Sequence, residues 1–292
     1  MKAVPFDYVR PGSLDEACAL LAEDADARVI AGGQSLVPML AMRLARPARL
    51  VDILRLSELS GIRNGDSRIV IGATTRQATA EAHPLIVGKV PLLKIVMPWI
   101  GHAATRARGT VGGSIAHADP SAEIPLVAAT LEAEIVVQNI HGQSVIAASE
   151  FFVGPMVAAI PQGALVREIR MPVWTQPRIG TGFHEVNARH SDFAFVCAAA
   201  QVGLDDQGRC TACAVGVGGL GEYPIALKEA AAVLIATTLD EATITDAVEA
   251  AMAKVDVFGD LHASADYRRR VAGVLARRAL IDARRSALDA AQ

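Results

Sequence analysis

The sequence has no apolar run of the roughly 18 residues that a membrane-spanning helix requires. Residues 1–7 also lack the apolar segment of a signal peptide, so we expect a cytoplasmic protein without a membrane span. Positive charge is not in excess, because 28 Lys and Arg residues stand against 31 Asp and Glu residues, giving a formal net charge of −3. This balance does not favour binding to nucleic acid or to an anionic membrane surface.

Cysteine is scarce, with only Cys18, Cys197, Cys210 and Cys213 in the chain. These four are too scattered for a disulfide framework or an iron–sulfur cluster. Cys210 and Cys213 have C-x-x-C spacing, but one pair cannot complete a tetrahedral metal site and there is no second pair. Strand alternation predicts that their sulfur atoms point to opposite faces. We therefore expect reduced, buried thiols and no metal site.

Common nucleotide-binding and hydrolase motifs are absent, apart from one formal match. Residues 216–221 (GVGGLG) fit G-x-G-x-x-G, between an expected strand and an expected helix. Pro224 falls at the start of that helix, and no strand carrying a ribose-binding acid follows. The preceding strand is expected in an antiparallel hairpin, so we interpret the match as accidental. There is no nucleophile elbow either, and no catalytic residue is assigned.

The most informative stretch that is present is residues 110–123 (TVGGSIAHADPSAE). No aliphatic face repeats in it at helical or strand spacing, so a loop is expected. Glycine permits positive φ and close approach of a ligand, and successive N–H groups in such a turn can hold an anion. Thr110 and Ser114 would add a hydroxyl on either side.

A second double-glycine stretch, residues 29–36 (VIAGGQSL), follows a short apolar strand and precedes an amphipathic run. Ser35 is a candidate N-cap, with Pro38 in the first turn of the helix, and such a helix start can bind an anion. A single Gly-Gly pair is common turn punctuation. Two of them suggest a ligand with a diphosphate at its centre.

The chain has 292 residues, 52% of them hydrophobic, which allows one large or two ordinary domains. Periodicity and turn residues predict strands at residues 28–30, 49–53, 68–73, 134–138, 143–147, 164–171, 193–204 and 210–217. They predict helices at residues 13–21, 37–46, 75–82, 91–100, 124–130, 222–237, 240–254 and 264–290. This order indicates an α+β fold with a βαβ-like first block and a domain boundary within residues 172–180.

The two glycine stretches resemble the paired double-glycine motifs of the FAD-binding medium subunits of molybdenum hydroxylases. That family includes the flavoprotein subunits of carbon monoxide dehydrogenase and of xanthine dehydrogenase-like enzymes. The likeness extends to residues 6–8, 71–75 and 267–280, and so covers nearly the whole chain. It is strongest to medium subunits of enzymes that hydroxylate N-heterocycles or related aromatic substrates.

The resemblance implies that both glycine stretches wrap the FAD diphosphate, and that further residues contact the rest of the cofactor. Ser114 stands where the family usually has asparagine, Glu123 where aspartate is frequent, and His184 where many relatives have lysine. Phe193 replaces a tyrosine close to the isoalloxazine ring. The implied FAD-binding residues are Val29, Ile30, Ala31, Gly32, Gly33, Gln34, Ser35, Leu36, Gly101, Thr110, Val111, Gly112, Gly113, Ser114, Glu123, Leu165, His184 and Phe193.

The resemblance also implies a fold and a role. The fold would be an FAD-binding domain of the vanillyl-alcohol-oxidase (PCMH) type over residues 1–176, with subdomains at about 1–57 and 58–176. An α+β domain of the carbon monoxide dehydrogenase flavoprotein type, an antiparallel sheet plus helices, would follow over residues 177–292. The chain would carry electrons from 2Fe-2S clusters on a small subunit to an external acceptor. A large subunit would hold the molybdenum cofactor, in a dimer of heterotrimers.

Two alternatives remain open. One is a self-contained FAD-dependent reductase of the same fold that uses NADPH, similar to the enolpyruvyl-glucosamine reductase of cell-wall synthesis. It would need an NADPH site and a proton donor, and neither is identified in the sequence. The other is a scaffold subunit that has lost its flavin, against which the two intact glycine stretches argue.

Overall fold

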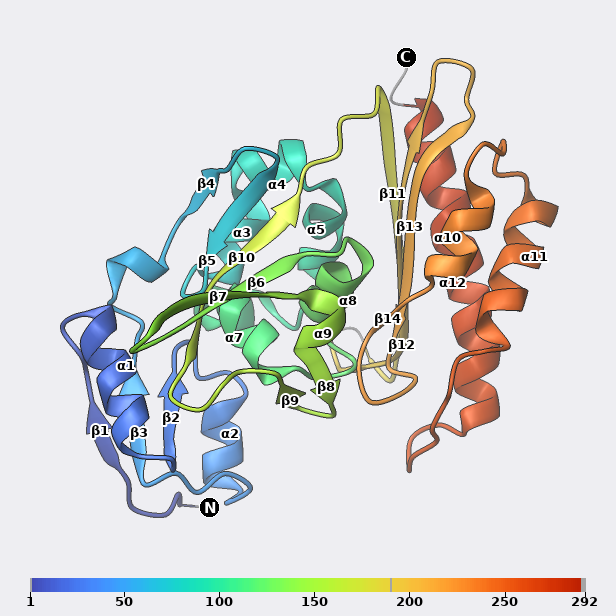
Figure 1. Ribbon diagram of the computed structural model, residues 1–292. Coiled ribbons are helices and arrows are strands. Elements are labelled where there is room, and N and C mark those ends of the chain that lie inside the picture. Colours follow the sequence, from blue (N-terminus) through green and yellow to red (C-terminus); the bar gives the residue numbers. More distant parts are fainter. Residues whose placement is uncertain (1, 190, 290–292) are drawn as a thin grey trace.

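The computed structural model describes residues 2–189 and 191–289, and Figure 1 shows how their elements are arranged. A small sheet near the N-terminus lies at one end of the molecule, and a larger sheet with several short helices forms the middle. A third sheet, with long helices on its outer side, forms the other end. The fold class is therefore α+β, as expected.

The first sheet is parallel, in the order β1-β3-β2, and its crossovers are helical. Its first helix begins where the sequence predicted, because Ser13 Oγ accepts a hydrogen bond from the N–H of Glu16 at 3.1 Å. The strand nearest the N-terminus was not predicted, since three residues give too short a pattern. The elements are β1 (Asp7–Val9), α1 (Leu14–Glu23), β2 (Ala27–Ile30), α2 (Leu36–Ala41), β3 (Arg49–Asp52) and the 3-10 helix η1 (Ser57–Leu59).

The second sheet is antiparallel, in the order β4-β5-β10-β6-β7. Its hairpin and its central strand match the predicted strands at residues 134–147 and 164–171. Its strands are β4 (Ile62–Asn64), β5 (Arg68–Gly72), β6 (Glu134–Asn139), β7 (Gly142–Ala147) and β10 (Leu165–Pro172), with a separate pair β8 (Phe152–Gly154) and β9 (Val157–Ala158). Its helices are α3 (Gln77–Ala82), α4 (Pro84–Lys89), α5 (Pro91–Val96), η2 (Met97–Trp99), α6 (Ala103–Arg108), α7 (Val111–His117), α8 (Glu123–Thr130) and α9 (Ala148–Phe151).

The third sheet is also antiparallel, in the order β11-β12-β13-β14, and α12 covers its outer face. Close packing needs glycine in β11, since a Cβ at Gly180 or Gly182 would lie 2.0 or 2.1 Å from a backbone oxygen of α12. The elements are β11 (Arg178–Asn187), β12 (Ala194–Leu204), β13 (Cys210–Gly218), β14 (Ile225–Ala226), α10 (Lys228–Leu234), α11 (Glu241–Met252) and α12 (Ala265–Asp289). The expected division at 176/177 falls in the connection between β10 and β11.

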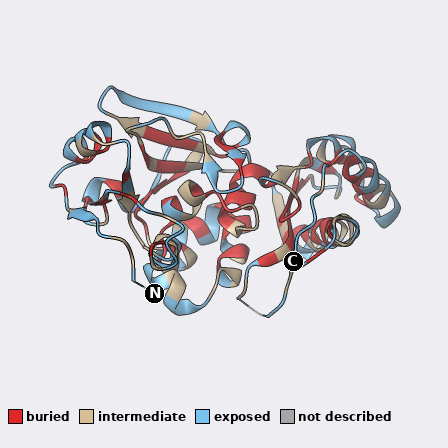
Figure 2. Cartoon of the chain, turned by 90° about the horizontal axis from the view of Figure 1, so that it is seen from below, coloured by how far each residue is buried: buried red, intermediate tan, exposed pale blue. Residues whose placement is uncertain are grey.

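The largest buried cluster joins the middle part to the third sheet, while the first sheet packs around a separate cluster with α1. Phe183, Cys197 and Ala199 of the third sheet belong to the same buried cluster as the helices of the middle part. The opposite face of that sheet packs with α10, α11 and α12 in a second cluster. Figure 2 shows the buried residues gathered between these layers. Because both faces of the third sheet are covered in this way, the face toward the middle part is held in a fixed place.

Two expectations for residues 210–237 need correction. Ala212 pairs with Gly203 and Cys210 with Leu204, so Thr211 is an extra residue in a β-bulge. The bulge brings Cys210 and Cys213 to the same face of the sheet, where both pack against the cluster of α10, α11 and α12, so the prediction of opposite faces was wrong. The predicted helix at residues 222–237 is shorter, because β14 occupies its first part.

The G-x-G-x-x-G match at residues 216–221 lies where a strand ends. Gly216 and Gly218 are part of β13, which pairs with antiparallel neighbours on both sides. A Cβ at Gly216 would lie 2.1 Å from Thr130 Oγ1, so this glycine is required for packing against α8. In the described part of the chain, no helix is both long and apolar enough to cross a membrane.

Candidate functional site

A cleft of about 600 Å³ lies where the first sheet, the middle part and the start of β12 meet. We call it the main cleft. Both glycine stretches line it, although 73 residues separate them in the sequence. The residues of the sequence prediction that line it are Val29, Ile30, Ala31, Gly32, Gly33, Gln34, Ser35, Leu36, Gly101, Thr110, Gly112, Gly113, Ser114, Glu123, Leu165 and Phe193.

The first glycine stretch passes directly over the backbone that precedes the second. A Cβ at Gly32 would lie 2.4 Å from the carbonyl oxygen of Arg108 and 2.9 Å from Gly109 Cα. Gly33 has φ of +70°, a conformation that L side chains rarely adopt. The two glycines therefore do different things, since the first allows contact between the loops and the second allows the turn.

This first stretch leaves a row of hydrogen-bond donors free. Among the described residues, the backbone N–H groups of residues 32–36 donate to no protein acceptor. Successive free N–H groups in a turn with a positive φ form a concave anion-binding site. The side chain of Gln34 closes the turn by donating from Nε2 to the Gly32 carbonyl at 3.1 Å. The predicted N-cap at Ser35 makes no side-chain capping bond.

The second stretch is helical, so the expectation of a loop there was wrong. Thr110 is the N-cap of α7, and its Oγ1 accepts a hydrogen bond from the Gly113 N–H at 3.1 Å. The N–H groups of Val111, Gly112 and Ser114 also have backbone acceptors. No N–H group of this first turn remains free for an anion. The stretch instead offers the exposed Cα of Gly113 and the half-buried hydroxyl of Ser114.

Packing requires glycine at positions 112 and 113. A Cβ at Gly112 would lie 2.5 Å from Ala73 Cα, and one at Gly113 would lie 2.6 Å from Thr110 Oγ1. The first glycine brings α7 against the end of β5, and the second leaves room for the cap. A short helix of residues 111–117 has no apolar periodicity of its own, which explains why the sequence pattern did not predict it.

Two carboxyl groups beside the main cleft hold protons unusually tightly. Burial raises the pKa of Glu123 to about 7, and the negative charge of Asp119 contributes to the rise. Burial also raises the pKa of Glu185 on β11 to about 8, and the charge of Glu123 adds to this. Glu185 Oε1 accepts from Asn187 Nδ2 at 2.7 Å, while its Oε2 has no partner among the described residues.

One end of the cleft is apolar. Leu165 is buried, and Met156 and Ile160 line the wall next to it. Phe193 borders the cleft just before β12 and is 74% exposed, so its ring is available to stack on a planar ligand. The sequence analysis missed the contribution of residues 156–160, because a short apolar segment carries no motif.

Two residues that were predicted to contact the cofactor, Val111 and His184, do not line the main cleft. Val111 is fully buried in the core, because its side chain points away from the cleft. His184 lies on the face of β11 that also carries Gly180 and Gly182, toward α12, where its Nε2 is 2.9 Å from Asp282 Oδ2. The alternation of the strand therefore turns His184 away from the main cleft, and we withdraw it as a cofactor contact.

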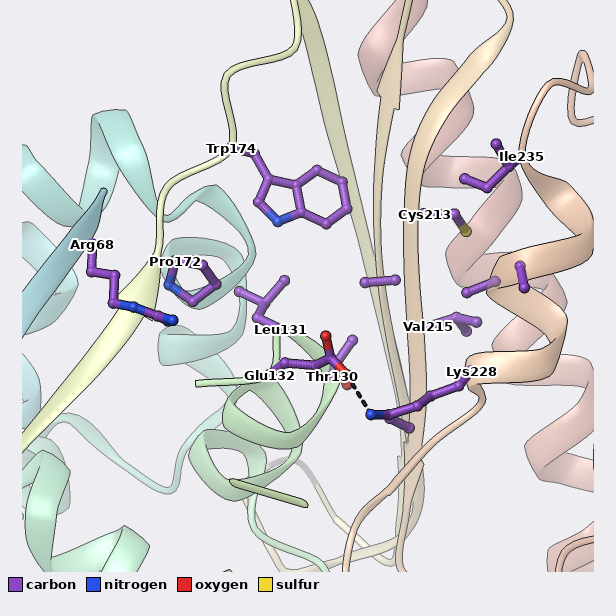
Figure 3. A pocket seen from close by; sticks show the side chains of 14 residues that line it. Arg68, Thr130, Leu131, Glu132, Pro172, Trp174, Cys213, Val215, Lys228 and Ile235 are labelled. Carbon is purple, nitrogen blue, oxygen red and sulfur yellow. Dashed lines mark ion pairs between the residues drawn. The ribbon is translucent and has the colours of Figure 1, made fainter. Parts of the chain in front are cut away.

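A second cavity, of about 460 Å³, lies between the middle part and α10 (Figure 3). Its charged residues are already paired, since Lys228 contacts Glu132 and Arg68 contacts Glu134 at 2.7 Å. Neither glycine stretch borders it. The main cleft is therefore the candidate functional site.

Comparison with known families identifies the family of this chain. A family model described as the FAD binding domain in molybdopterin dehydrogenase matches residues 4–174. A second, described as the CO dehydrogenase flavoprotein C-terminal domain, matches residues 181–283. The chain belongs to the FAD-binding medium subunits of the molybdenum hydroxylase family.

Individual relatives cover almost the whole chain. It is 40% identical over 284 residues to the 6-hydroxypseudooxynicotine dehydrogenase complex subunit alpha of Paenarthrobacter nicotinovorans, covering 97% of this chain and 96% of the relative. It is 34% identical over 278 residues to the carbon monoxide dehydrogenase medium chain of Afipia carboxidovorans, covering 94% and 95%. The solved structure of quinoline 2-oxidoreductase from Pseudomonas putida 86 superposes with a TM-score of 0.92 at 35% identity, covering 99% of this chain and 100% of that one.

These findings confirm the predicted family, the fold of an FAD-binding domain followed by an antiparallel sheet with helices, and the class of oxidoreductase subunit. The residues present fit FAD chemically. Free N–H groups at residues 32–36 suit a diphosphate, carboxyl groups at Glu123 and Asp119 suit sugar or ribityl hydroxyls, and the apolar end with Phe193 suits a flat ring.

Proposed function

We propose that this chain binds FAD in the main cleft and serves as the electron-transfer subunit of a molybdenum-containing hydroxylase. The observation that carries the proposal is the row of free N–H groups at residues 32–36, which line the same cleft of about 600 Å³ as Gly113 and Ser114. A diphosphate is the part of FAD that needs such donors.

Each part of the cleft then has a role. The N–H groups of the first glycine stretch bind the diphosphate, and the Ser114 hydroxyl donates to it from the other side. Glu123 accepts from a hydroxyl of the cofactor, and Leu165 and Phe193 contact the isoalloxazine ring. Two residues that the sequence analysis did not assign, Asp119 and Ser121, extend the polar wall next to Glu123.

When bound, FAD supplies the redox chemistry, and this chain holds it, shields it from water and sets its electrostatic surroundings. We propose that a small subunit with 2Fe-2S clusters delivers electrons and that a large subunit with the molybdenum cofactor oxidises the organic substrate. A paired assembly, a dimer of heterotrimers, is expected because closed two-fold symmetry is the commonest arrangement. We assign no residue of the described chain as a general acid or base toward the organic substrate.

The test is to purify the chain alone and together with a candidate small and large subunit. The isolated chain should bind FAD but should not oxidise the organic substrates of the complex. Substrate-dependent dye reduction should appear only when all three subunits are present. Size and metal content of the complex should show both partners.

Two outcomes would overturn the proposal. A lone chain that turns over a substrate with NADPH would establish the self-contained reductase instead. A folded chain that binds no FAD when FAD is supplied in excess would establish a scaffold role.

A further inference from the structure

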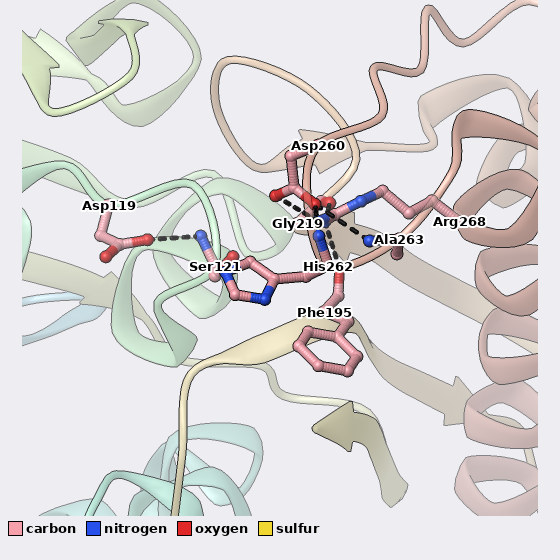
Figure 4. A network of polar contacts seen from close by, with 8 residues as sticks. All are labelled: Asp119, Ser121, Phe195, Gly219, Asp260, His262, Ala263 and Arg268. Atoms are coloured by element: carbon pink, nitrogen blue, oxygen red, sulfur yellow. Dashed lines mark hydrogen bonds and ion pairs between the residues drawn. The ribbon is translucent and has the colours of Figure 1, made fainter. Parts of the chain in front are cut away.

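Arg268, in the first turns of α12, is buried with an exposed fraction of only 6%. Its Nη1 donates to the carbonyl oxygen of Phe195 at 2.6 Å and to that of Gly219, and its Nη2 contacts Asp260 Oδ2 at 2.7 Å (Figure 4). One guanidinium group thus joins the beginning of β12, the end of β13 and the loop before α12. The sequence likeness included this position, but the fold alone does not explain why a charged group is placed there.

The loop that supplies Asp260 is held in one conformation. Asp260 Oδ1 accepts hydrogen bonds from the N–H groups of His262 and Ala263, at 2.8 and 3.0 Å. The imidazole of His262 stacks on the ring of Phe195, with centroids 5.9 Å apart and planes 14° from parallel. Arg268 keeps the pKa of Asp260 low, at about 2, so this carboxyl stays ionised over the physiological range.

Both carbonyl groups that Arg268 holds are connected to the main cleft. Phe195 follows Phe193, the exposed ring at the cleft edge, by two residues. Gly219 donates its N–H to the carbonyl of Pro120 at 2.9 Å, and Pro120 lies between two cleft residues, Asp119 and Ser121. Gly219 has φ of +77°, and a Cβ there would lie 2.5 Å from Phe195 O and 3.4 Å from Ser121 Oγ. The segment that carries Phe193 and the segment 119–121 are therefore both connected to the two carbonyl groups, of Phe195 and Gly219, to which Arg268 donates.

We propose that Arg268 is a positioning residue for the flavin, which fixes Phe193 and the segment 119–121 at the spacing that the isoalloxazine end of the cofactor requires. This inference rests on the proposed function. It assigns a site role to a residue of the C-terminal part that borders no cofactor itself.

Stability alone is a weak reason for this arrangement. Arg268 Nε has no hydrogen-bond partner among the described residues, so the burial of the charge is incompletely compensated. Buried ion pairs are often no more stabilising than apolar residues of similar volume. What the guanidinium provides, and an apolar residue could not, is a fixed fork of donors toward two carbonyl groups and a carboxylate.

The next residue offers a matched control. Arg269 also lies on α12 and donates from Nη1 to one backbone carbonyl, that of Met252, at 2.6 Å. That carbonyl is at the end of α11, away from the main cleft. Arg268→Gln and Arg269→Gln therefore remove the same group from the same helix, but only the first removes a link to the cleft walls.

The experiment measures three quantities on each full-length variant: the affinity of the FAD-free protein for FAD, the visible circular dichroism of the bound flavin, and the midpoint of thermal unfolding. We expect Arg268→Gln to weaken FAD binding by about tenfold or more and to change the flavin dichroism, since a charge-assisted hydrogen-bond fork is lost. Arg269→Gln should leave affinity and dichroism at wild-type values even where its unfolding midpoint falls.

Two further variants keep the test decisive if Arg268→Gln does not fold. Arg268→Lys retains the charge but not the fork, and Asp260→Asn removes the ion pair while leaving both carbonyl contacts in place. Each should weaken FAD binding and change the flavin dichroism relative to wild type, and less than Arg268→Gln does where that variant folds. Wild-type affinity and dichroism in every foldable Arg268 variant would overturn the inference, as would equal losses in the Arg269 control. Failure of the wild-type protein to bind FAD would instead refute the proposed function.

Discussion

Gly32 lies against the backbone of Arg108, and a Cβ at position 32 would stand 2.4 Å from the Arg108 carbonyl oxygen. The Arg76 guanidinium donates to that same oxygen, and the Gln77 N–H donates to the Gly109 carbonyl at 2.9 Å. The segment before the second glycine stretch is therefore fixed from two sides. Contact with Gly32 sets the width of the main cleft between the two stretches.

The first prediction concerns Gly33, whose φ of +70° is unfavourable for a β-branched residue. Gly33→Val should lose FAD binding and cost about 1–2 kcal/mol of folding stability from the left-handed conformation alone. The Cβ would also lie 3.1 Å from Val37 Cγ2. FAD content after purification and the free energy of unfolding in urea are the measurements.

Gly88 provides the control for this substitution. It lies in α4 with no atom within 4 Å of an added Cβ and no positive φ. Gly88→Ala should keep full FAD content and gain up to about 1 kcal/mol, the usual helix preference for alanine. If purified Gly33→Val protein contains equimolar FAD, the first glycine stretch is not part of the FAD-binding site.

The second prediction concerns Gly113, for which the physical reason is different. Its φ is not positive, but a Cβ would lie 2.6 Å from Thr110 Oγ1, the atom that caps α7. Gly113→Val should therefore break the cap, cost about 1 kcal/mol or more, and abolish flavin binding. Thr110→Val, which removes the cap without crowding the cleft, should reproduce the loss of stability. If both variants bind FAD normally, α7 does not contribute to the site.

The sequence predicted the composition of this site better than its geometry. The glycines, Glu123, Leu165 and Phe193 all line one cleft, because the family likeness carried positions that local patterns cannot place. Local patterns failed where backbone hydrogen bonds decide the structure. A capping threonine turned residues 111–117 into a helix, and one bulge residue, Thr211, reversed the expected face of Cys213.

Long-range placement was the other limit. His184 was expected at the flavin by likeness alone, but the alternation of β11 directs it to Asp282. Glu185, its neighbour, faces the opposite way and interacts with Glu123, which no motif indicated. The role of Arg268 was equally invisible, because its partners lie 73 and 49 residues away in the sequence.

The third prediction concerns Phe193. Since its side chain is 74% exposed, Phe193→Ala should leave the unfolding midpoint of the FAD-free protein almost unchanged. Loss of a ring that stacks on the flavin should speed reoxidation of the reduced cofactor by the acceptor or shift its midpoint potential. Stopped-flow absorbance and redox titration would measure both. Identical kinetics together with an identical potential would exclude contact between Phe193 and the flavin.

The fourth prediction concerns pH and stability. The folded protein raises the pKa of Glu123 from its ordinary value of 4.5 to about 7. Between these values the folded state keeps a proton that the unfolded state has released, so this group's stabilisation is complete below pH 4.5 and is lost as pH rises through 7. Glu123→Gln should therefore raise the unfolding midpoint of the FAD-free protein at pH 8 relative to wild type, and have little effect at pH 4.5.

Two comparisons make that result specific. Glu185→Gln should show the same sign over a range that extends to about pH 8, since the pKa of Glu185 is raised further. Glu222, which is exposed, serves as the surface control, and Glu222→Gln should change neither midpoint. An unfolding midpoint for Glu123→Gln that matches wild type at both pH values would show that the folded state does not raise the pKa of Glu123.

The most direct measurement of the central claim is the amount of FAD released by acid from the purified, FAD-saturated chain. The sequence has no convincing His or Cys attachment motif for covalent flavin. We therefore predict equimolar FAD in the acid supernatant and a colourless precipitate. Yellow colour that stays with the precipitate would contradict non-covalent binding, and a folded chain that releases no flavin would contradict the assignment of the main cleft as the FAD site.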